Sequence, residues 1–134
     1  MSLQQSDGLR NALGDGYEAF IGTAPTVKIF TGSPPAHCSN ADSGTVLATF
    51  TLPSDWLTAA STGTKTKLGT WSTTGANGGN AGYFRIYDTS GTNCHEQGTV
   101  TASGGGGDMT LDNINIAVGQ TVLVNSFTRT FGAP

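Results

Sequence analysis

The amino-acid sequence predicts an all-β fold: an antiparallel β-sandwich or jelly roll of about seven to eight strands, preceded by a short N-terminal helix. Short apolar or alternating runs recur from Thr26 onward, separated by Gly, Pro, Asn and Asp, which is typical of strands joined by turns. The spaces between the runs are too short for helices, so a parallel sheet with helical crossovers is excluded. Only the segment after Ser6 carries apolar residues at helical spacing.

The length of 134 residues is near the usual size of one domain, with room for a single hydrophobic core. We expect a single domain over residues 1–134, made of an N-terminal helical arm at 1–24 and a β-sandwich at 25–134. The sequence contains no internal repeat of the length that builds solenoids.

The arm is predicted to form a marginal helix. Ser6 or Asp7 is suited to cap its start, because a short polar side chain there accepts a hydrogen bond from a free backbone N–H. Gly14 and Gly16 each weaken a helix by up to about 1 kcal/mol relative to Ala, so the helix needs a surface to dock on. That surface belongs to the rest of this chain or to a neighbouring subunit. The apolar residues that share one helix face are Leu9, Leu13, Tyr17 and Phe20.

The expected strands follow at 27–30, 45–52, 65–71, 83–87, 97–102, 109–116 and 121–130. Successive side chains of a strand point to opposite faces, so Phe84 and Ile86 share the apolar face of their strand. A helical turn at 55–60, capped by Ser54, is expected to place Trp56 at one end of the sandwich. Loops are expected at 32–43, 73–82 and 103–107, the last as a flexible hairpin connection. The expected core residues are Trp71, Phe84, Ile86, Leu111 and Phe127.

Charged residues make up only 11% of the sequence, and Thr, Ser, Gly, Asn and Ala fill positions that Lys and Glu usually occupy. The resulting surface is hydroxyl-rich and weakly charged, which favours close packing against other subunits. Nucleic acid is not an expected partner, because the net charge is -3 and the sequence has no run of Lys and Arg. No apolar run approaches the roughly 20 residues that span a bilayer, so we expect a soluble protein, made in the cytoplasm, without a membrane partner.

Two Cys and two His, in the pairs His37-Cys38 and Cys94-His95, nominally supply a tetrahedral zinc set. Adjacent residues of an extended chain point to opposite faces, so this spacing does not favour a metal site. A disulfide between Cys38 and Cys94 would instead tether the proline-rich loop to a strand start. Two free, mostly buried thiols are an equally good interpretation, and in a cytosolic protein the bond would form only after lysis.

The sequence offers no catalytic set, so we expect no enzyme activity, no catalytic residue, no cofactor and no bound metal. The glycine run from Gly104 to Gly107 lacks the Lys-Ser or Lys-Thr of a phosphate-binding loop. Asp108 and Asp112 are interpreted as surface residues beside a hairpin rather than as a calcium site or an acid pair. A small-molecule ligand is not expected. Aromatic residues that would form a sugar platform if exposed are Tyr83, Tyr87 and Trp71.

Several short segments follow one another in a distinctive order: Gly-Leu-Arg-Asn-Ala-Leu from Gly8, Val-Lys-Ile-Phe-Thr-Gly from Val27, Gly-Tyr-Phe-Arg-Ile-Tyr from Gly82, Cys94-His95, Gly-Gly-Asp-Met-Thr-Leu-Asp-Asn from Gly106 and Val-Gly-Gln-Thr-Val from Val118. In content and order they resemble a family of small virion structural proteins of tailed bacteriophages and prophages, often of unassigned function. The resemblance spans nearly the whole chain and implies a component of the phage particle.

Proteins of comparable size in other tailed phages are capsid decoration, or cement, proteins: β-sandwiches that bind the expanded capsid at symmetry-related junctions. The resemblance therefore implies a place in the virion, with the major capsid protein and copies of the chain itself, as a dimer or trimer, as partners. Such a protein needs two binding surfaces, one on the arm and one on sandwich edges or long loops. The alternatives are a phage tail or neck component and a carbohydrate-binding β-sandwich module. Arm residues expected in the assembly interface are Leu9, Leu13, Tyr17, Phe20 and Ile21.

Overall fold

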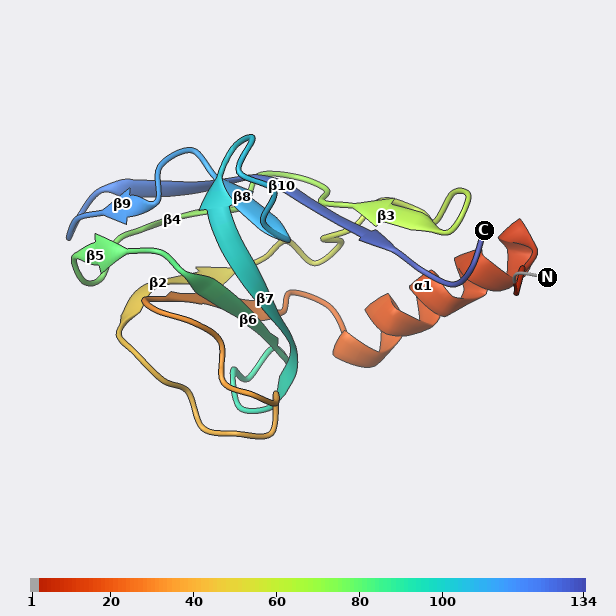
Figure 1. Ribbon diagram of the computed structural model, residues 1–134, viewed down its shortest axis with the longest axis horizontal. Coiled ribbons are helices and arrows are strands. Elements are labelled where there is room, and N and C mark those ends of the chain that lie inside the picture. Colours follow the sequence, from red (N-terminus) through yellow and green to blue (C-terminus); the bar gives the residue numbers. More distant parts are fainter. Residues whose placement is uncertain (1–2) are drawn as a thin grey trace.

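The computed structural model describes residues 3–134, which are mostly β-structure with a short N-terminal helix. The helix lies at one end of the long axis of the molecule, and strands β5 and β9 lie at the other end (Figure 1). The elements are α1 (Asp7–Ile21), β1 (Thr26–Phe30), β2 (Val46–Thr51), β3 (Thr64–Thr66), β4 (Ser72–Thr74), β5 (Gly79–Asn80), β6 (Tyr83–Tyr87), β7 (Cys94–Ala102), β8 (Met109–Leu111), β9 (Asn115–Ile116) and β10 (Thr121–Thr130).

The strands form a curled, mixed sheet of eight strands in the order β2-β1-β6-β7-β8-β10-β3, with β4 also paired to β10. Strands β5 and β9 make a separate two-stranded ladder. Within the described residues, β7 and β8 run parallel, whereas the other strand pairs are antiparallel. The expectation of a wholly antiparallel sheet is therefore wrong at the β7–β8 pair.

The glycine run explains how two parallel strands are joined by so short a connection. The chain leaves β7 at Ala102 and returns alongside Thr101, whose hydroxyl accepts a hydrogen bond from the backbone N–H of Gly107 at 3.0 Å. A Cβ at Gly105 or Gly107 would lie 2.7 or 2.9 Å from Thr101 atoms, so only glycine fits there. Residues 103–107 are thus not the hairpin connection that their composition suggested.

Helix α1 begins and ends at the residues that the capping rules favour. The Ser6 hydroxyl accepts a hydrogen bond from the backbone N–H of Leu9 at 3.2 Å, which confirms Ser6 as the cap. At the other end Gly22 has a φ of 96°, and its N–H donates to the carbonyl of Glu18 at 2.9 Å. A residue with a Cβ rarely adopts that φ, so Gly22 ends the helix after Ile21.

The strand predictions are accurate where the apolar pattern is continuous. The expected strands at 83–87 and 121–130 coincide with β6 and β10, and 27–30 and 45–52 lie within one residue of β1 and β2. The run at 109–116 divides into β8 and β9, and the run at 65–71 forms a strand only in its first residues, in β3. The expected loop at 73–82 contains the short strand β5 and overlaps β4, which begins one residue earlier.

The expected helical turn at 55–60 is wrong, because the backbone of this segment hydrogen-bonds to residues 66–68 and not within a helical turn. The carbonyl of Trp56 accepts from Leu68 N–H at 2.9 Å, and the N–H of Thr58 donates to the carbonyl of Thr66 at 2.8 Å. The Trp56 indole N–H donates to the carbonyl of Gly22 at 3.0 Å. Trp56 is fully buried, so its ring joins the core beside the end of α1 rather than closing an open end.

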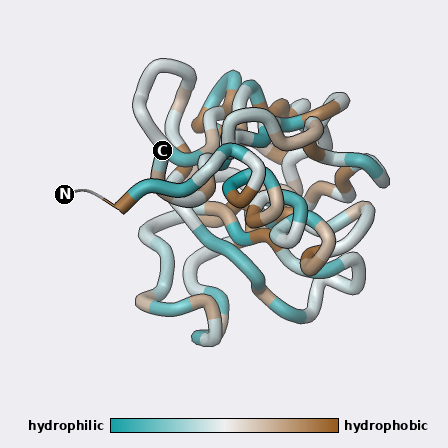
Figure 2. The backbone as a smooth tube through the Cα atoms, turned by 90° about the vertical axis from the view of Figure 1, so that its right-hand side faces the viewer, coloured by the Kyte–Doolittle hydropathy of each residue, from teal (hydrophilic) through white to brown (hydrophobic). Residues whose placement is uncertain are grey.

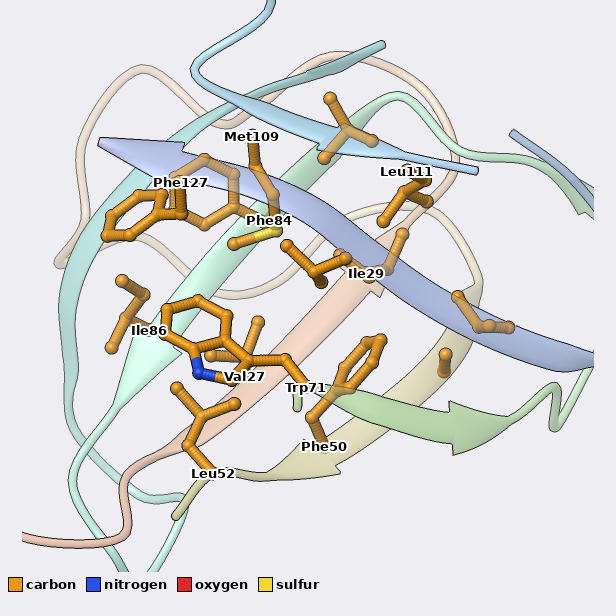
Figure 3. Packing of buried hydrophobic residues seen from close by; sticks show 14 of the residues in the cluster. Val27, Ile29, Phe50, Leu52, Trp71, Phe84, Ile86, Met109, Leu111 and Phe127 are labelled. Atoms are coloured by element: carbon orange, nitrogen blue, oxygen red, sulfur yellow. The ribbon is translucent and has the colours of Figure 1, made fainter. Parts of the chain in front are cut away.

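The core lies inside the curl of the sheet and draws side chains from both ends of the strand order. Figure 3 shows Val27, Ile29 and Ile86 on one side of the cluster and Phe127, Met109 and Leu111 on the other. The Phe127 ring lies 5.7 Å from that of Phe84, edge to face, and 5.6 Å from that of Trp71. All five expected core residues are in this cluster, each at most 1% exposed: Trp71, Phe84, Ile86, Leu111 and Phe127.

Strand β6 is buried on both faces, although its sequence alternates. Phe84 and Ile86 face the core, whereas Tyr83, Arg85 and Tyr87 are covered by the loop that joins β1 to β2. Figure 2 views the molecule from the α1 end and shows such outer loops mostly in white and teal, with brown hydrophobic stretches lying further in. The loop residues supply polar partners for buried polar side chains, so the second face of β6 is closed without apolar residues.

Candidate functional site

Helix α1 is joined to the sheet by charged residues. The ammonium of Lys65 in β3 is 2% exposed and lies 3.0 Å from a carboxylate oxygen of Asp15 and 2.9 Å from one of Glu18. Arg10 is also buried, and its guanidinium donates to the carbonyl of Phe131 at 3.0 Å. The helix is therefore attached to the body of the protein largely through ion pairs and hydrogen bonds.

The ion pairs at Lys65 decide its charge state. Burial by itself lowers the pKa of Lys65, but the hydrogen bonds and charges of Glu18 and Asp15 outweigh it, so the pKa is raised from its ordinary value. Lys65 is therefore a permanent cation between two carboxylates at neutral pH. Sequence reasoning missed this residue; a Lys within a predicted strand of a chain so poor in charge was the available signal.

Gly14 lets the helix lie directly on the sheet. A Cβ at this position would be 3.0 Å from the Phe131 ring and 3.1 Å from Cδ of Lys65. A larger residue would hold the helix away from β3, and the Lys65 ammonium would then lose its close approach to Asp15. The glycine that weakens the isolated helix is thus the one at which the helix makes its closest contact.

Three aromatic residues continue the contact between α1 and the body of the protein toward the end of the helix. We call Tyr17, Trp56 and Phe131 the aromatic seam. The Tyr17 hydroxyl donates to Glu96 at 2.7 Å, and Arg129 donates to both oxygens of the same carboxylate at 3.1 and 3.0 Å. Burial, together with the charge of Glu96, raises the pKa of Tyr17, so the phenol stays protonated as a donor. The Tyr17 ring lies 6.0 Å from Trp56 and 5.1 Å from Phe131. Tyr17 therefore belongs to the inner side of the helix.

The opposite side of α1 is apolar and exposed. Leu9, Leu13 and Phe20 are 49%, 43% and 76% exposed. Positions 9, 13, 16 and 20 follow one another at steps of four, three and four residues, which places them in one stripe along the helix. No charged residue of α1 lies in this stripe. We call the following residues, all exposed, the outer face of α1: Leu9, Ala12, Leu13, Gly16, Ala19 and Phe20.

The structure divides the five residues expected in an assembly interface. Leu9, Leu13 and Phe20 lie on the outer face of α1, whereas Ile21 is 5% exposed and Tyr17 packs against the core. The inclusion of Tyr17 and Ile21 in an external interface is therefore wrong. Helical spacing alone cannot separate the two sides, because Tyr17 lies between the outer stripe and the buried positions on the helical wheel.

Cys38 lies in the loop between β1 and β2, and Cys94 lies at the start of β7. Both thiols line one pocket of about 640 Å³, with Asp42 and Tyr87 also in its wall. Both side chains are partly buried, and neither is bonded. Burial, with the neighbouring Cys38 thiol as the next cause, raises the pKa of Cys94 to about 12, so Cys94 is a neutral thiol at pH 7.

Arg85 holds the loop above this pocket, although the sequence analysis gave this residue no role. Its guanidinium donates to Asp42 at 2.8 Å and to the carbonyls of Asn40 and His37 at 2.8 and 3.3 Å. Tyr87 donates to the same oxygen of Asp42 at 2.6 Å, and burial and Asp42 raise the pKa of Tyr87. This network fixes the loop on β6.

The aromatic residues considered for a sugar platform are not on the surface. Tyr83, Tyr87 and Trp71 are 0%, 3% and 1% exposed, so they do not form a sugar-binding platform. Tyr83 stacks on Phe30 at 4.7 Å and donates to the carbonyl of Ser43, and the Trp71 indole donates to the carbonyl of Leu68. Each polar group thus has a partner inside this chain.

The remaining polar candidates also have local partners. His37 hydrogen-bonds Ser39, whereas the His95 ring lies edge-on to Phe20. Asp108 accepts from the backbone N–H and the hydroxyl of Thr99. Asp112 accepts from the backbone N–H of Leu123 at 3.4 Å.

In residues 3–134 no group of three or more His, Cys, Asp or Glu is placed to hold a metal ion. The described helix α1 is too short and too polar to cross a bilayer. No protein-family model, no curated protein and no solved structure matches this chain. The site is therefore interpreted from its geometry, in which the outer face of α1 is an exposed apolar surface that the His95 ring touches at Phe20.

Proposed function

We propose that this chain is a bacteriophage virion structural protein: a capsid decoration, or cement, protein that binds the head shell and stabilises it in many copies. The observation that carries the proposal is the outer face of α1. A helix on the surface of a monomer normally turns its apolar side inward and its charged side to solvent. Here Glu18 is mostly covered beside the buried Lys65, and Asp15 pairs with the same ammonium from the solvent side, whereas Leu9 and Phe20 point outward.

A partner that covers the outer face would remove exposed apolar area from water with little desolvation of charged groups. The face contains no charge, so docking desolvates no ion. The rest of the surface, with 11% charged residues in the whole sequence, repels neighbouring copies weakly. For these reasons we assign the outer face of α1 to contact with the major capsid protein, and contacts between copies of the chain to its other surfaces.

A cement protein joins partners, so it needs a second surface. Val118 is 72% exposed in the turn between β9 and β10, at the end of the molecule away from α1 (Figure 1). Two apolar contacts at opposite ends of the long axis suit a protein that links neighbouring shell subunits or copies of itself as a dimer or trimer. The proposed location is accordingly the virion.

For the architecture, we propose that the curled sheet corresponds to a β-sandwich or jelly roll whose two layers meet across the core. Strands β2, β1, β6 and β7 would form one layer and β8, β10, β3 and β4 the other. Contacts between β2 and β4, which lie at opposite ends of the strand order, support this view, as do the Phe84 and Phe127 rings that touch across the core. No catalytic role is part of the proposal.

The test is a co-sedimentation titration of the purified protein with expanded heads of the parent phage that lack it. Saturation at hundreds of copies per head, with added resistance of the heads to heat or chelator, is the expected result. Saturation at about a dozen copies would replace the cement role by that of a neck or tail ring. An absence of binding to heads and tails would overturn the virion role, and a response of Trp fluorescence to a saccharide panel would favour glycan recognition instead.

The outer face is tested with Leu13→Ser and a matched control, Leu68→Ser. Leu13 and Leu68 are 43% and 38% exposed, so both variants are expected to fold and to lose similar apolar area. Leu13→Ser should weaken binding to heads by about tenfold or more, because a buried Leu side chain contributes on the order of 2 kcal/mol. Leu68→Ser should bind like the wild type. Equal binding by the two variants would remove α1 from the interface.

A further inference from the structure

We propose that Cys38 and Cys94 are a redox pair that closes to an intramolecular disulfide by exchange with a small-molecule disulfide, such as oxidised glutathione. The bond would tie the loop between β1 and β2 to the start of β7. This inference does not depend on the proposed role in the virion, because it rests on a different part of the molecule.

Cys38 occupies a turn whose ends are both held by Arg85. The N–H of Asn40 donates to the carbonyl of His37 at 3.0 Å, which closes the turn around Cys38. Arg85 donates to those same two residues, at the carbonyls of His37 and Asn40. Arg85 is 2% exposed, so this clamp is shielded from water and fixes the turn on β6.

Hydrogen bonds of Asp42 and Gln97 also hold the loop on the same strands. Asp42 accepts from Arg85 and from Tyr87 through one oxygen, and the Gln97 amide donates to the carbonyl of Pro35 at 2.6 Å. Gln97 also accepts from Arg85 at 3.0 Å. The backbone around Cys38 is thus attached to β6 and β7 on both sides of the thiol.

Cys94 is held from the strand side. It pairs with Tyr87 across the β6–β7 ladder, and its thiol donates to the carbonyl of Glu96 at 3.5 Å. The two cysteines line the same pocket, and each thiol belongs to the other's immediate surroundings. A disulfide requires Cα atoms within roughly 7 Å and Cβ vectors that converge, and two cysteines in the wall of one pocket are the arrangement from which such a bond can close.

The thiol–disulfide exchange needs only the two cysteines and oxidised glutathione. One thiolate of the pair attacks a sulfur of oxidised glutathione, forms a mixed disulfide and releases one glutathione thiol. The second cysteine then attacks the mixed disulfide, closes the Cys38–Cys94 bond and releases the second glutathione. The two protein thiols lose two protons and two electrons, which reduce the small disulfide to two thiols.

Closure of the bond should stabilise the fold, because it restrains a long loop in the unfolded chain. We expect the Tm of the oxidised protein to lie about 10 °C above that of the reduced protein. Protease cleavage within residues 32–45 should also slow. Reduction with a dithiol should reverse both changes.

The experiment treats the folded, reduced protein with oxidised glutathione and follows intact mass and a peptide map. Loss of two hydrogen atoms from the mass, with a cross-linked Cys38–Cys94 peptide, is the expected result. A product that carries two glutathionyl groups, or two thiols that react only after denaturation, would overturn the proposal. Cys38→Ser and Cys94→Ser are the controls: each should stop at a single mixed disulfide, and the Tm of the double variant should not respond to the oxidant.

Discussion

Strand β6 and helix α1 both bury charged side chains against the body of the protein, but they leave different surfaces outside. In β6 the core covers Phe84 and Ile86, and a polar loop covers Arg85 on the other face, so the strand has no free side. In α1 only the inner side is covered, by Lys65 and the aromatic seam, and the outer face is apolar.

The two regions therefore contribute unequally to stability and to assembly. The sheet combines apolar burial with a satisfied polar network, so its removal should unfold the protein. Helix α1 is held on its inner side by hydrogen bonds, ion pairs and the packing of Tyr17 and Ile21, so its outer apolar side chains contribute little to folding and remain available to a partner. Each of the following variants separates these contributions in one of the two regions.

The largest difference is expected between two phenylalanines. Phe127→Ala should lower the free energy of unfolding by about 4 kcal/mol, because it removes a ring that contacts both Phe84 and Trp71 in the core. Phe20→Ala, at a ring that is 76% exposed, should change it by less than about 0.5 kcal/mol. Denaturant unfolding of both variants measures the contrast. Equal losses would show that the outer face of α1 is part of the folding core.

The next effect concerns the polar face of β6. Arg85→Met should cost about 3 kcal/mol, because it leaves the carboxylate of Asp42 and the carbonyls of His37 and Asn40 without their donor. Amide hydrogen exchange should then rise within residues 32–45 more than in β1. Arg129→Met, at a cation that is only partly buried, is the matched control and should cost less. Unchanged exchange in the loop would argue against the clamp.

A smaller effect is expected for the attachment of α1. Lys65→Met should cost about 2 kcal/mol and increase amide exchange in α1, because Asp15 and Glu18 lose their shared cation. The pKa of Lys65 is raised in the folded state, so its contribution is complete below the ordinary Lys value of about 10.5. It is lost as the pH rises through the higher folded-state pKa. Wild-type α1 should therefore loosen above about pH 10.5, and the variant should lack this step.

The smallest effect is expected from two glycines of the same helix. A Cβ added at Gly16 would meet nothing within 4 Å, so Gly16→Ala should raise the free energy of unfolding by up to about 1 kcal/mol. At Gly14 the same methyl group would meet Phe131 and Lys65, and this gain should be lost or reversed. Thermal unfolding compares the two variants. A Gly14→Ala variant as stable as Gly16→Ala would mean that α1 is not held tightly on β3.

The local pattern of apolar and polar residues in the sequence predicted the strands with continuous apolar runs, the helix cap at Ser6 and the core residues. Those features depend on neighbours in sequence, through alternation and short-range hydrogen bonds. The covered second face of β6 could not be predicted, because it depends on a loop about 45 residues earlier in the chain. The proximity of Cys38 and Cys94 could not be predicted for the same reason. A sequence with two cysteines suggests that they pair, but it does not show where the loop of Cys38 lies relative to the strand of Cys94.

The candidate interface was predicted only in part, for a physical reason. Helical spacing assigned one face to Leu9, Leu13, Tyr17 and Phe20, but it cannot tell which side meets the sheet. That choice is made by Gly14, which permits close contact, and by Lys65, which attracts the carboxylates of α1. An isolated Lys in a strand and a Gly in a helix are each ambiguous alone, and their combination is visible only in three dimensions.

The tight return between β7 and β8 has a consequence for the route by which the chain folds. Val100 pairs with Met109 close by in sequence, whereas Phe30 of β1 pairs with Tyr83 of β6 across a much longer loop. Since the entropy of closing a loop grows with its length, the β7–β8 pair can form early, as can the β6–β7 pair, in which Tyr87 pairs with Cys94. A destabilising change at Met109 would then slow folding, whereas one at Val27 would mainly speed unfolding. Glycines that leave no room for a methyl group beside Thr101 would thus help to form one of the first strand pairs of the curled sheet.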